Sequence, residues 1–339
     1  METSRFRLSF AEHPSDQVLP AVGLTVFGLC SGERTLDPLY RRRSTAPSDS
    51  ISGERTAHLF AQLSLELLQD GVSMENLYLL LQELRTAAHR NITLRRLFWR
   101  SSEVFLFLVQ TLEECLHGCQ SLGGVYTTDQ LLLSTLILQT LAIMFRETEV
   151  EAARSSLLFA KKGALISRLL LALICDPDGE KHSRGSASDS ELQALLSEYL
   201  DAACSLLFEL LLMGFETSRC FQGDNFVSVC WILRVLQPHP HLLPFIRHQA
   251  RQLVQVLSDQ QGSILGPVQS VLLFQRCRLL LACLQHSNQL GQHLQTHFRE
   301  EFRYFVTPSS TEEKLQPHYP IYGPTLRLVQ CIQTLIQRR

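Results

Sequence analysis

The sequence lacks the short motifs that mark most catalytic sites. It contains no GxSxG, no HExxH and no glycine-rich phosphate loop, and no GxGxxG opens a helix after a predicted strand. Its glycines fall mostly at the ends of predicted helices, where C-capping explains them. These absences predict a protein that is not an enzyme and that binds no cofactor.

The sequence also lacks a CxxC pair, although it has ten cysteines. They are scattered through apolar stretches, so we expect most of them to be buried, reduced and free of zinc. Two arrangements keep a metal site open as an alternative: His293 and His297 lie one helical turn apart, and Cys115, His117 and Cys119 lie close together. We favour a solvated polar face for the histidines, because glutamines surround them.

No uncharged apolar run reaches the length of a typical membrane helix. The longest uncharged stretch, residues 130–145, is shorter than the about 20 mostly apolar residues that a membrane helix needs, and it contains serine and threonine. Residues 1–17 include acidic side chains and no apolar run typical of a secretory signal. With the unpaired cysteines, these features predict an intracellular protein, cytoplasmic or nuclear, without a transmembrane segment.

Lysine is scarce, because only four of the 31 basic residues are lysine and the rest are arginine. Arginine binds carboxylates and phosphates through two parallel hydrogen bonds. Residues 225–299 hold six arginines and six histidines against one acidic residue, Asp259. We therefore predict that a basic face in this segment binds a protein partner, most simply an acidic one. The residues predicted to form this face are Arg234, Arg247, Arg251, Arg276 and Arg278.

Two alternatives to a protein-binding face remain open. The arginines can be ordinary solvated side chains, or they can be neutralised within the fold. The acidic residues available for such pairing are Glu191, Glu198, Asp201, Glu300 and Glu301. A basic surface can also dock on nucleic acid or on an anionic membrane. Nucleic acid is less favoured, because base stacking needs aromatic side chains and only Phe98 and Trp99 are interleaved with arginines.

From residue 53 onward, the sequence contains one helical pattern after another. Apolar residues recur every three to four positions, and turn or capping residues separate the segments. Helices are predicted near 54–69, 73–89, 93–117 with a break at Ser101 and Ser102, 129–147, 149–160, 164–175, 188–216, 224–237, 241–258, 265–286, 288–305 and after a proline-rich loop at 308–320. The predicted N-caps are Ser73, Thr127 or Thr128, Ser188 and Asp224.

Residues 1–52 differ from the rest of the chain. Phe6, Leu8 and Phe10 alternate with polar residues, which is typical of a short strand, and a polar linker follows. We predict a poorly ordered or strand-containing arm here. Ser44 follows three arginines in the pattern that basophilic kinases favour, so it is a candidate phosphorylation site.

The helix spacing predicts an all-α fold. Two helices per roughly 40–47 residues is typical of armadillo and HEAT repeats, so we predict a stack of antiparallel helix pairs over residues 53–339. A flexible loop at 176–187 interrupts it. A globular multi-helix bundle is the alternative, because no residue pattern recurs at that period. The sequence gives no indication of the oligomeric state.

Four stretches resemble a known family: residues 36–41, 94–103, 144–149 and 299–305. They are similar to the C-terminal helical part of the uncharacterised vertebrate family known as chromosome twelve open reading frame fifty-six. The resemblance covers the chain from about residue 36 to its end, and the family carries further N-terminal sequence. It implies no activity and no functional residues. The helical pattern and the missing catalytic motifs therefore remain the basis of the functional prediction, a non-enzymatic helical scaffold or adaptor.

Overall fold

The computed structural model describes residues 48–121, 126–146, 152–177, 187–220, 227–259 and 262–337. Every regular element in these ranges is a helix, and none of them contains a strand, so the all-α prediction is confirmed. Most of the predicted N-terminal arm, including Ser44, lies outside the described residues. So does most of the predicted loop at 176–187.

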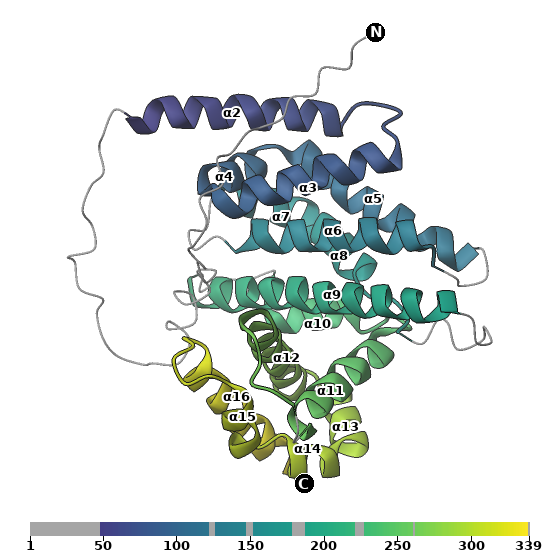
Figure 1. Ribbon diagram of the computed structural model, residues 1–339, viewed down its shortest axis with the longest axis vertical. Helices are drawn as coiled ribbons and strands as arrows, with labels where there is room; N and C mark the ends of the chain where they lie inside the picture. The colour runs from purple at the N-terminus through teal and green to yellow at the C-terminus, as the bar shows by residue number, and fades with distance from the viewer. Residues whose placement is uncertain are drawn as a thin grey trace.

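The N-terminal half of the fold consists of short and medium-length helices above a long central one (Figure 1). Its helices are α2 (Ser48–Leu67), α3 (Met74–Arg90), α4 (Ile92–Arg100), α5 (Ser102–Ser121), α6 (Thr128–Phe145), α7 (Ala152–Phe159), the 3₁₀ turn η3 (Ala160–Gly163) and α8 (Ala164–Ala172).

The C-terminal half begins with the central helix, α9. Its helices are α9 (Ala187–Cys220), α10 (Val229–Leu236), α11 (Leu242–Ser258), α12 (Pro267–His286), α13 (Asn288–His297), α14 (Arg299–Phe305), α15 (Pro308–Lys314) and α16 (Tyr322–Gln337).

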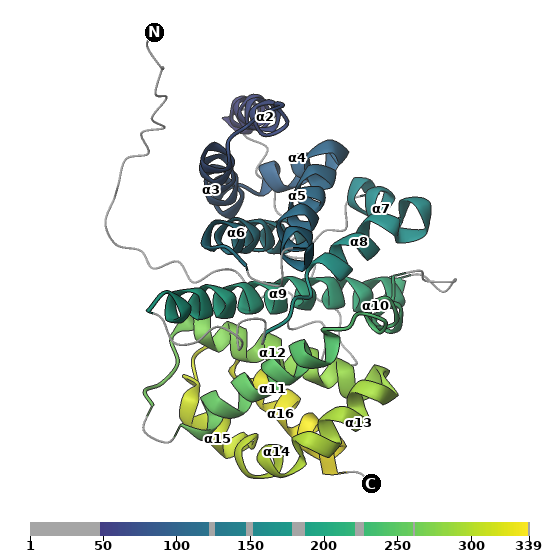
Figure 2. The same ribbon diagram turned by 90° about the vertical axis from the view of Figure 1, so that its right-hand side faces the viewer.

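The helices form layers along the long axis of the molecule. Both views place α9 across the middle, with α6 packed on one side of it and α12 on the other (Figures 1 and 2). Beyond α6 lie α3 and then α2, at one end of the molecule. In the other half, α12 contacts α9, α10, α11, α13 and α16, so it lies at the centre of a group of helices.

Helices α6 and α12 are buried around nearly their whole circumference. Each is long and apolar enough to cross a membrane by length and composition alone, but 72% and 67% of their apolar windows are buried inside the fold. Helices that are apolar on all sides need neighbours on all sides. The layered packing against α9 provides those neighbours, which is typical of core helices.

An aromatic cluster fixes the packing of α4, α5 and α6. The rings of Phe98, Trp99, Phe105 and Phe145 form five edge-on or tilted pairs with centroids 4.9–6.3 Å apart, the geometry that aromatic quadrupoles favour. The indole nitrogen of Trp99 donates a hydrogen bond to the carbonyl of Met144 at 3.1 Å. Phe98 and Trp99 are therefore core residues and are not available to stack on nucleic-acid bases.

Several predicted helix boundaries are confirmed. Ser73 caps α3, and its hydroxyl accepts a hydrogen bond from the backbone N–H of Asn76. Thr127 and Gln130 form a capping box at the start of α6. The predicted break at Ser101 separates α4 from α5. In each case a short polar side chain satisfies backbone groups that have no partner within the helix.

Other boundaries differ from the prediction. Helix α10 begins at Val229 with Ser228 as its N-cap, whereas Asp224, the predicted cap, lies outside the described residues. The predicted loop at 308–320 contains a helix, α15, because Thr307 caps it and Pro308 occupies its first turn, where proline is tolerated. The predicted helix 288–305 is divided at Phe298 into α13 and α14.

Candidate interaction surface

The five predicted face residues do not share one surface. Arg276 lies in the interior, 3% exposed, and its guanidinium pairs with Asp201 of α9. The prediction of an exposed arginine is therefore wrong for Arg276. The alternative of internal neutralisation applies to it, because Arg276 lies on a buried part of α12, where a charge needs a counterion.

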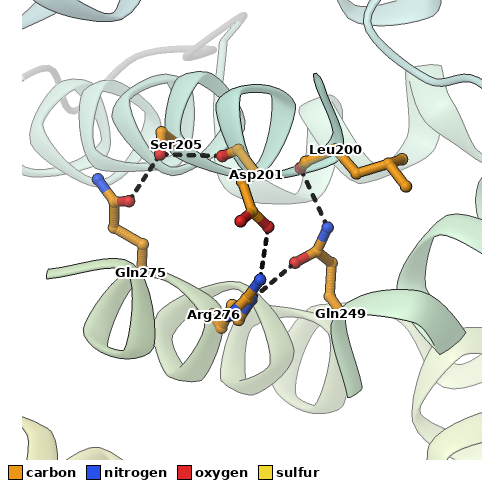
Figure 3. A network of polar contacts seen from close by, with 6 residues as sticks. All are labelled: Leu200, Asp201, Ser205, Gln249, Gln275 and Arg276. Atoms are coloured by element: carbon orange, nitrogen blue, oxygen red, sulfur yellow. Dashed lines mark hydrogen bonds and ion pairs between the residues drawn. The ribbon is translucent and has the colours of Figure 1, made fainter. Parts of the chain in front are cut away.

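Arg276 belongs to a polar network that joins three helices (Figure 3). Its Nε donates to Gln249 of α11 at 3.2 Å, and the Gln249 amide donates to the backbone carbonyl of Leu200 at 3.1 Å. The residues whose side chains form this buried polar network are Asp201, Ser205, Gln249, Gln275 and Arg276. The members of the network hydrogen-bond to one another and to the α9 backbone. The network therefore holds α11 and α12 against α9.

Burial raises the pKa of the Asp201 carboxyl above its usual value, and Arg276 acts in the opposite direction. The Asp201 side chain is one-third exposed, at 32%, whereas that of Arg276 is 4% exposed. Water can solvate the Asp201 carboxylate but not the buried Arg276 guanidinium. Loss of the carboxylate therefore leaves a buried charge without compensation, whereas loss of the guanidinium does not.

The remaining four arginines lie at the surface in two places. Arg278 stacks on the ring of Phe215, with 4.1 Å between its guanidinium carbon and the ring centre. Arg234 is exposed on α10. These two lie near the junction of α9, α10 and α12, whereas Arg247 and Arg251 lie on α11.

Arg247 lies close to His293 of α13, and Arg251 follows Arg247 by one turn of α11. Arg251 is exposed, and Arg247 is half-buried with its Nε enclosed and without a hydrogen-bond partner. The His293 and His297 rings are 4.3 Å apart, and His297 Nδ1 donates to the carbonyl of His293 at 2.9 Å. These four residues, Arg247, Arg251, His293 and His297, are called the α11–α13 basic face below.

The electrostatics of the α11–α13 basic face favour an anionic ligand. Burial lowers the pKa of His293, and the neighbouring His297 and Arg247 lower it further. Helices α11, α12 and α13 contain no aspartate or glutamate. Glu300 and Glu301 of α14 are exposed, and no ion pair among the described residues joins them to Arg247 or Arg251.

A second basic group lies between α3, α4 and α6, where the sequence shows five arginines and no acid over residues 84–102. Burial lowers the pKa of His89, with further lowering from Arg146, Arg85 and Arg95. Arginines here have partners in the fold: Arg85 donates to the side chain of Gln139, and Arg146 pairs with Glu209 at 2.9 Å. This group therefore contributes to the packing of α6 against its neighbours.

The structure describes no group of three or more histidine, cysteine, aspartate or glutamate side chains placed to hold a metal ion within its described ranges. The rings of His293 and His297 are close to each other but have no third ligand beside them. The side chains of His117 and Cys119 lie outside the described residues. Of the seven cysteines whose side chains are described, five are buried, and Cys230 and Cys331 are exposed.

Comparison with known proteins identifies the family of helical proteins to which this fold belongs. Residues 33–335 match the family model described as a protein of unknown function, DUF4551. Because the match covers most of the chain, the chain belongs to this family. No solved structure matches the chain.

Relatives of the chain carry the name predicted from the sequence resemblance. The mouse uncharacterised protein C12orf56 homolog is 37% identical over 86% of this chain and 58% of its own length. The human uncharacterised protein C12orf56 is 36% identical over 84% of this chain and 48% of its own length. The chain thus spans about half the length of the curated relatives it matches, and the sequence-based recognition of the family is confirmed.

Proposed function

We propose that the chain is a non-enzymatic helical scaffold that binds an acidic segment of a protein partner through the α11–α13 basic face. The observation that carries the proposal is the unpaired state of Arg247 and Arg251. A half-buried guanidinium with an enclosed Nε and no partner is costly in a folded protein, because an unsatisfied buried donor costs about 1–3 kcal/mol. A carboxylate from outside the chain would bind the exposed parts of the two guanidinium groups and supply the missing negative charge.

The layered architecture supports a scaffold role. Successive layers α2, α3, α6, α9 and α12 follow one another along the long axis, as in a helical-repeat stack of the armadillo or HEAT kind. Such stacks present long rows of side chains at fixed spacing, which suits the recognition of an extended partner segment. In this proposal the buried polar network holds α11 in place, because Gln249 on the inner side of α11 is bonded to α9 and α12.

A protein partner is preferred over nucleic acid for a structural reason. Sequence-tolerant binding of single strands uses aromatic platforms, and the aromatic residues next to the arginines of α4 are buried in the core. The α11–α13 basic face offers two guanidinium groups, which suit carboxylates.

The proposal is tested with a fluorescein-labelled glutamate-rich peptide, whose binding to the full chain is measured by fluorescence anisotropy. The double reversal R247E/R251E should weaken binding by at least about tenfold, because each lost charge-assisted hydrogen bond is worth about 1.5–3 kcal/mol. The matched control is R234E/R327E, which changes the net charge equally at two exposed arginines elsewhere. The control should bind within about twofold of the unmodified chain, since long-range charge effects are screened by salt.

Equal weakening in both double variants would show that net charge decides binding and would overturn the proposal. Tighter binding of duplex DNA or of phosphatidylserine vesicles than of the peptide, lost in R247E/R251E, would favour the alternative partner classes. If R247E/R251E lowers the melting temperature strongly, the milder R247Q/R251Q provides the same test with less electrostatic stress. Retained peptide binding in that folded variant would also contradict the proposal.

A further inference from the structure

Cys230 differs from the other cysteines whose side chains are described. Burial raises the pKa of the Cys204, Cys277 and Cys283 thiols to about 12, so these thiols stay protonated and unreactive. Cys230 is exposed at the surface, as is Cys331 on α16. Cys331 has no histidine beside it among the described contacts, whereas Cys230 has one.

Residues of three helices, α9, α10 and α12, surround the Cys230 thiol. Its Sγ lies 3.6 Å from Nδ1 of His286, the last residue of α12. The His286 ring lies 6.0 Å from the ring of Phe215 on α9, and the guanidinium of Arg278 stacks on that same ring. Cys230 itself is the second residue of α10, after the N-cap Ser228. A nucleophile, a proton acceptor and an arginine thus meet at one surface junction.

The protonation state of His286 suits it to receive a proton. Burial lowers the pKa of His286 below its usual value, and the nearby Arg278 lowers it further. A lowered pKa makes the imidazole a weaker base but keeps it neutral at neutral pH, so Nδ1 can accept the thiol proton across the 3.6 Å contact as the sulfur attacks.

We propose that Cys230 is a modification site that undergoes thiol–disulfide exchange with small disulfides bearing carboxylates. The thiol proton passes to Nδ1 of His286, and the thiolate sulfur attacks one sulfur of the incoming disulfide. The disulfide bond breaks, one half remains bound to Cys230 as a mixed disulfide, and the other half leaves as a thiolate. The leaving thiolate takes the proton from the imidazolium, so Cys230 is oxidised and the incoming disulfide is reduced.

The carboxylate preference comes from the arginines around the site. Arg234 follows Cys230 by one helical turn and is exposed, and Arg278 lies about two turns before His286 on α12, close enough to lower its pKa. These guanidinium groups attract an anionic disulfide and repel a cationic one. The site is separate from the α11–α13 basic face, so the inference does not depend on the proposed function.

The test measures mixed-disulfide formation by peptide mass spectrometry on the full folded chain, with glutathione disulfide as the anionic probe and cystamine as the cationic probe. In the unmodified chain, Cys230 should react with glutathione disulfide about tenfold faster than Cys331, since thiolate character and access decide such rates. The variant His286→Gln should reduce the Cys230 rate to near that of Cys331 and leave the Cys331 rate unchanged. Equal rates at the two thiols, or an unchanged Cys230 rate in His286→Gln, would overturn the proposal.

The buried thiols report whether the variant remains folded. If Cys277 and Cys283 become reactive in His286→Gln, the variant has lost its structure, and the charge comparison in the unmodified chain decides instead. There, the ratio of the glutathione disulfide rate to the cystamine rate should be several times higher at Cys230 than at Cys331. The same ratio at both thiols would show that the arginines select no ligand, which contradicts the proposed preference.

Discussion

The arginines on the two sides of helix α11 differ in whether the fold supplies a counterion. On its inner side, Gln249 is fully buried and bonds to Arg276, whose charge is matched by Asp201. On its outer side, Arg247 and Arg251 have no counterion within the described residues. The inner arginine contributes to the stability of the fold, whereas the outer arginines contribute little to it. This difference is the basis for proposing that the outer pair binds another molecule.

The largest expected effect comes from removing the inner counterion. The variant Asp201→Ala leaves the Arg276 guanidinium buried without a negative charge, so the free energy of unfolding should fall by about 3 kcal/mol. Urea denaturation measures this change. Glu198→Ala, an exposed residue one turn earlier on α9, is the control and should change the free energy of unfolding by less than about 0.5 kcal/mol.

A double variant sharpens the interpretation. Asp201→Ala combined with Arg276→Met removes both charges and keeps an apolar side chain of similar length, so its stability should return to within about 1 kcal/mol of the unmodified chain. Equal stability of the single and double variants would show that the charge pair is not what couples α12 to α9.

Partly buried histidines should make the stability of the fold depend on pH. Burial lowers the pKa of His89, His239, His286 and His293, and neighbouring basic side chains add to this. As the pH falls toward the usual histidine pKa of about 6.5, these groups take up protons more readily in the unfolded chain than in the folded one. The melting temperature should therefore fall as the pH is lowered from 7.5 to 5.5. His293→Gln should make this fall smaller, and an unchanged fall would remove His293 from the set.

The smallest expected effect is a gain in stability at the outer side. Arg247→Met removes an enclosed donor that has no partner, so the free energy of unfolding should rise by about 0.5 kcal/mol. The same substitution at Arg234, which is exposed, should leave it unchanged. A loss of more than about 1 kcal/mol in Arg247→Met would place Arg247 with the stabilising inner arginine.

Much of the fold could be predicted because its signals are local. Ser73, Thr127 and Ser101 mark helix ends by short-range hydrogen bonds, which depend only on nearby residues. From the sequence, Pro308 predicts a loop because proline breaks helices, yet after the cap Thr307 it starts a helix. The same residue type therefore predicts opposite structures, depending on the residue before it.

The candidate site was less predictable, because the direction of a side chain depends on tertiary packing. Helix α12 is apolar nearly all round, so its sequence gives no polar stripe from which to infer that Arg276 points inward. The exposure of Cys230 was missed for a related reason, since it lies in an apolar stretch whose buried stripe runs through Val229, Ile232 and Leu233. The histidine beside it comes from a helix 56 positions away in sequence.

A charge-swap experiment tests the central claim most directly. The chain carrying R247E/R251E should lose binding to the glutamate-rich peptide and gain binding to a lysine-rich peptide of the same length, because the face then carries negative charge. The control R234E/R327E should show neither change. If the lysine-rich peptide binds R247E/R251E and the control equally well, the α11–α13 basic face does not decide the choice of partner, and the account of the outer arginines is wrong.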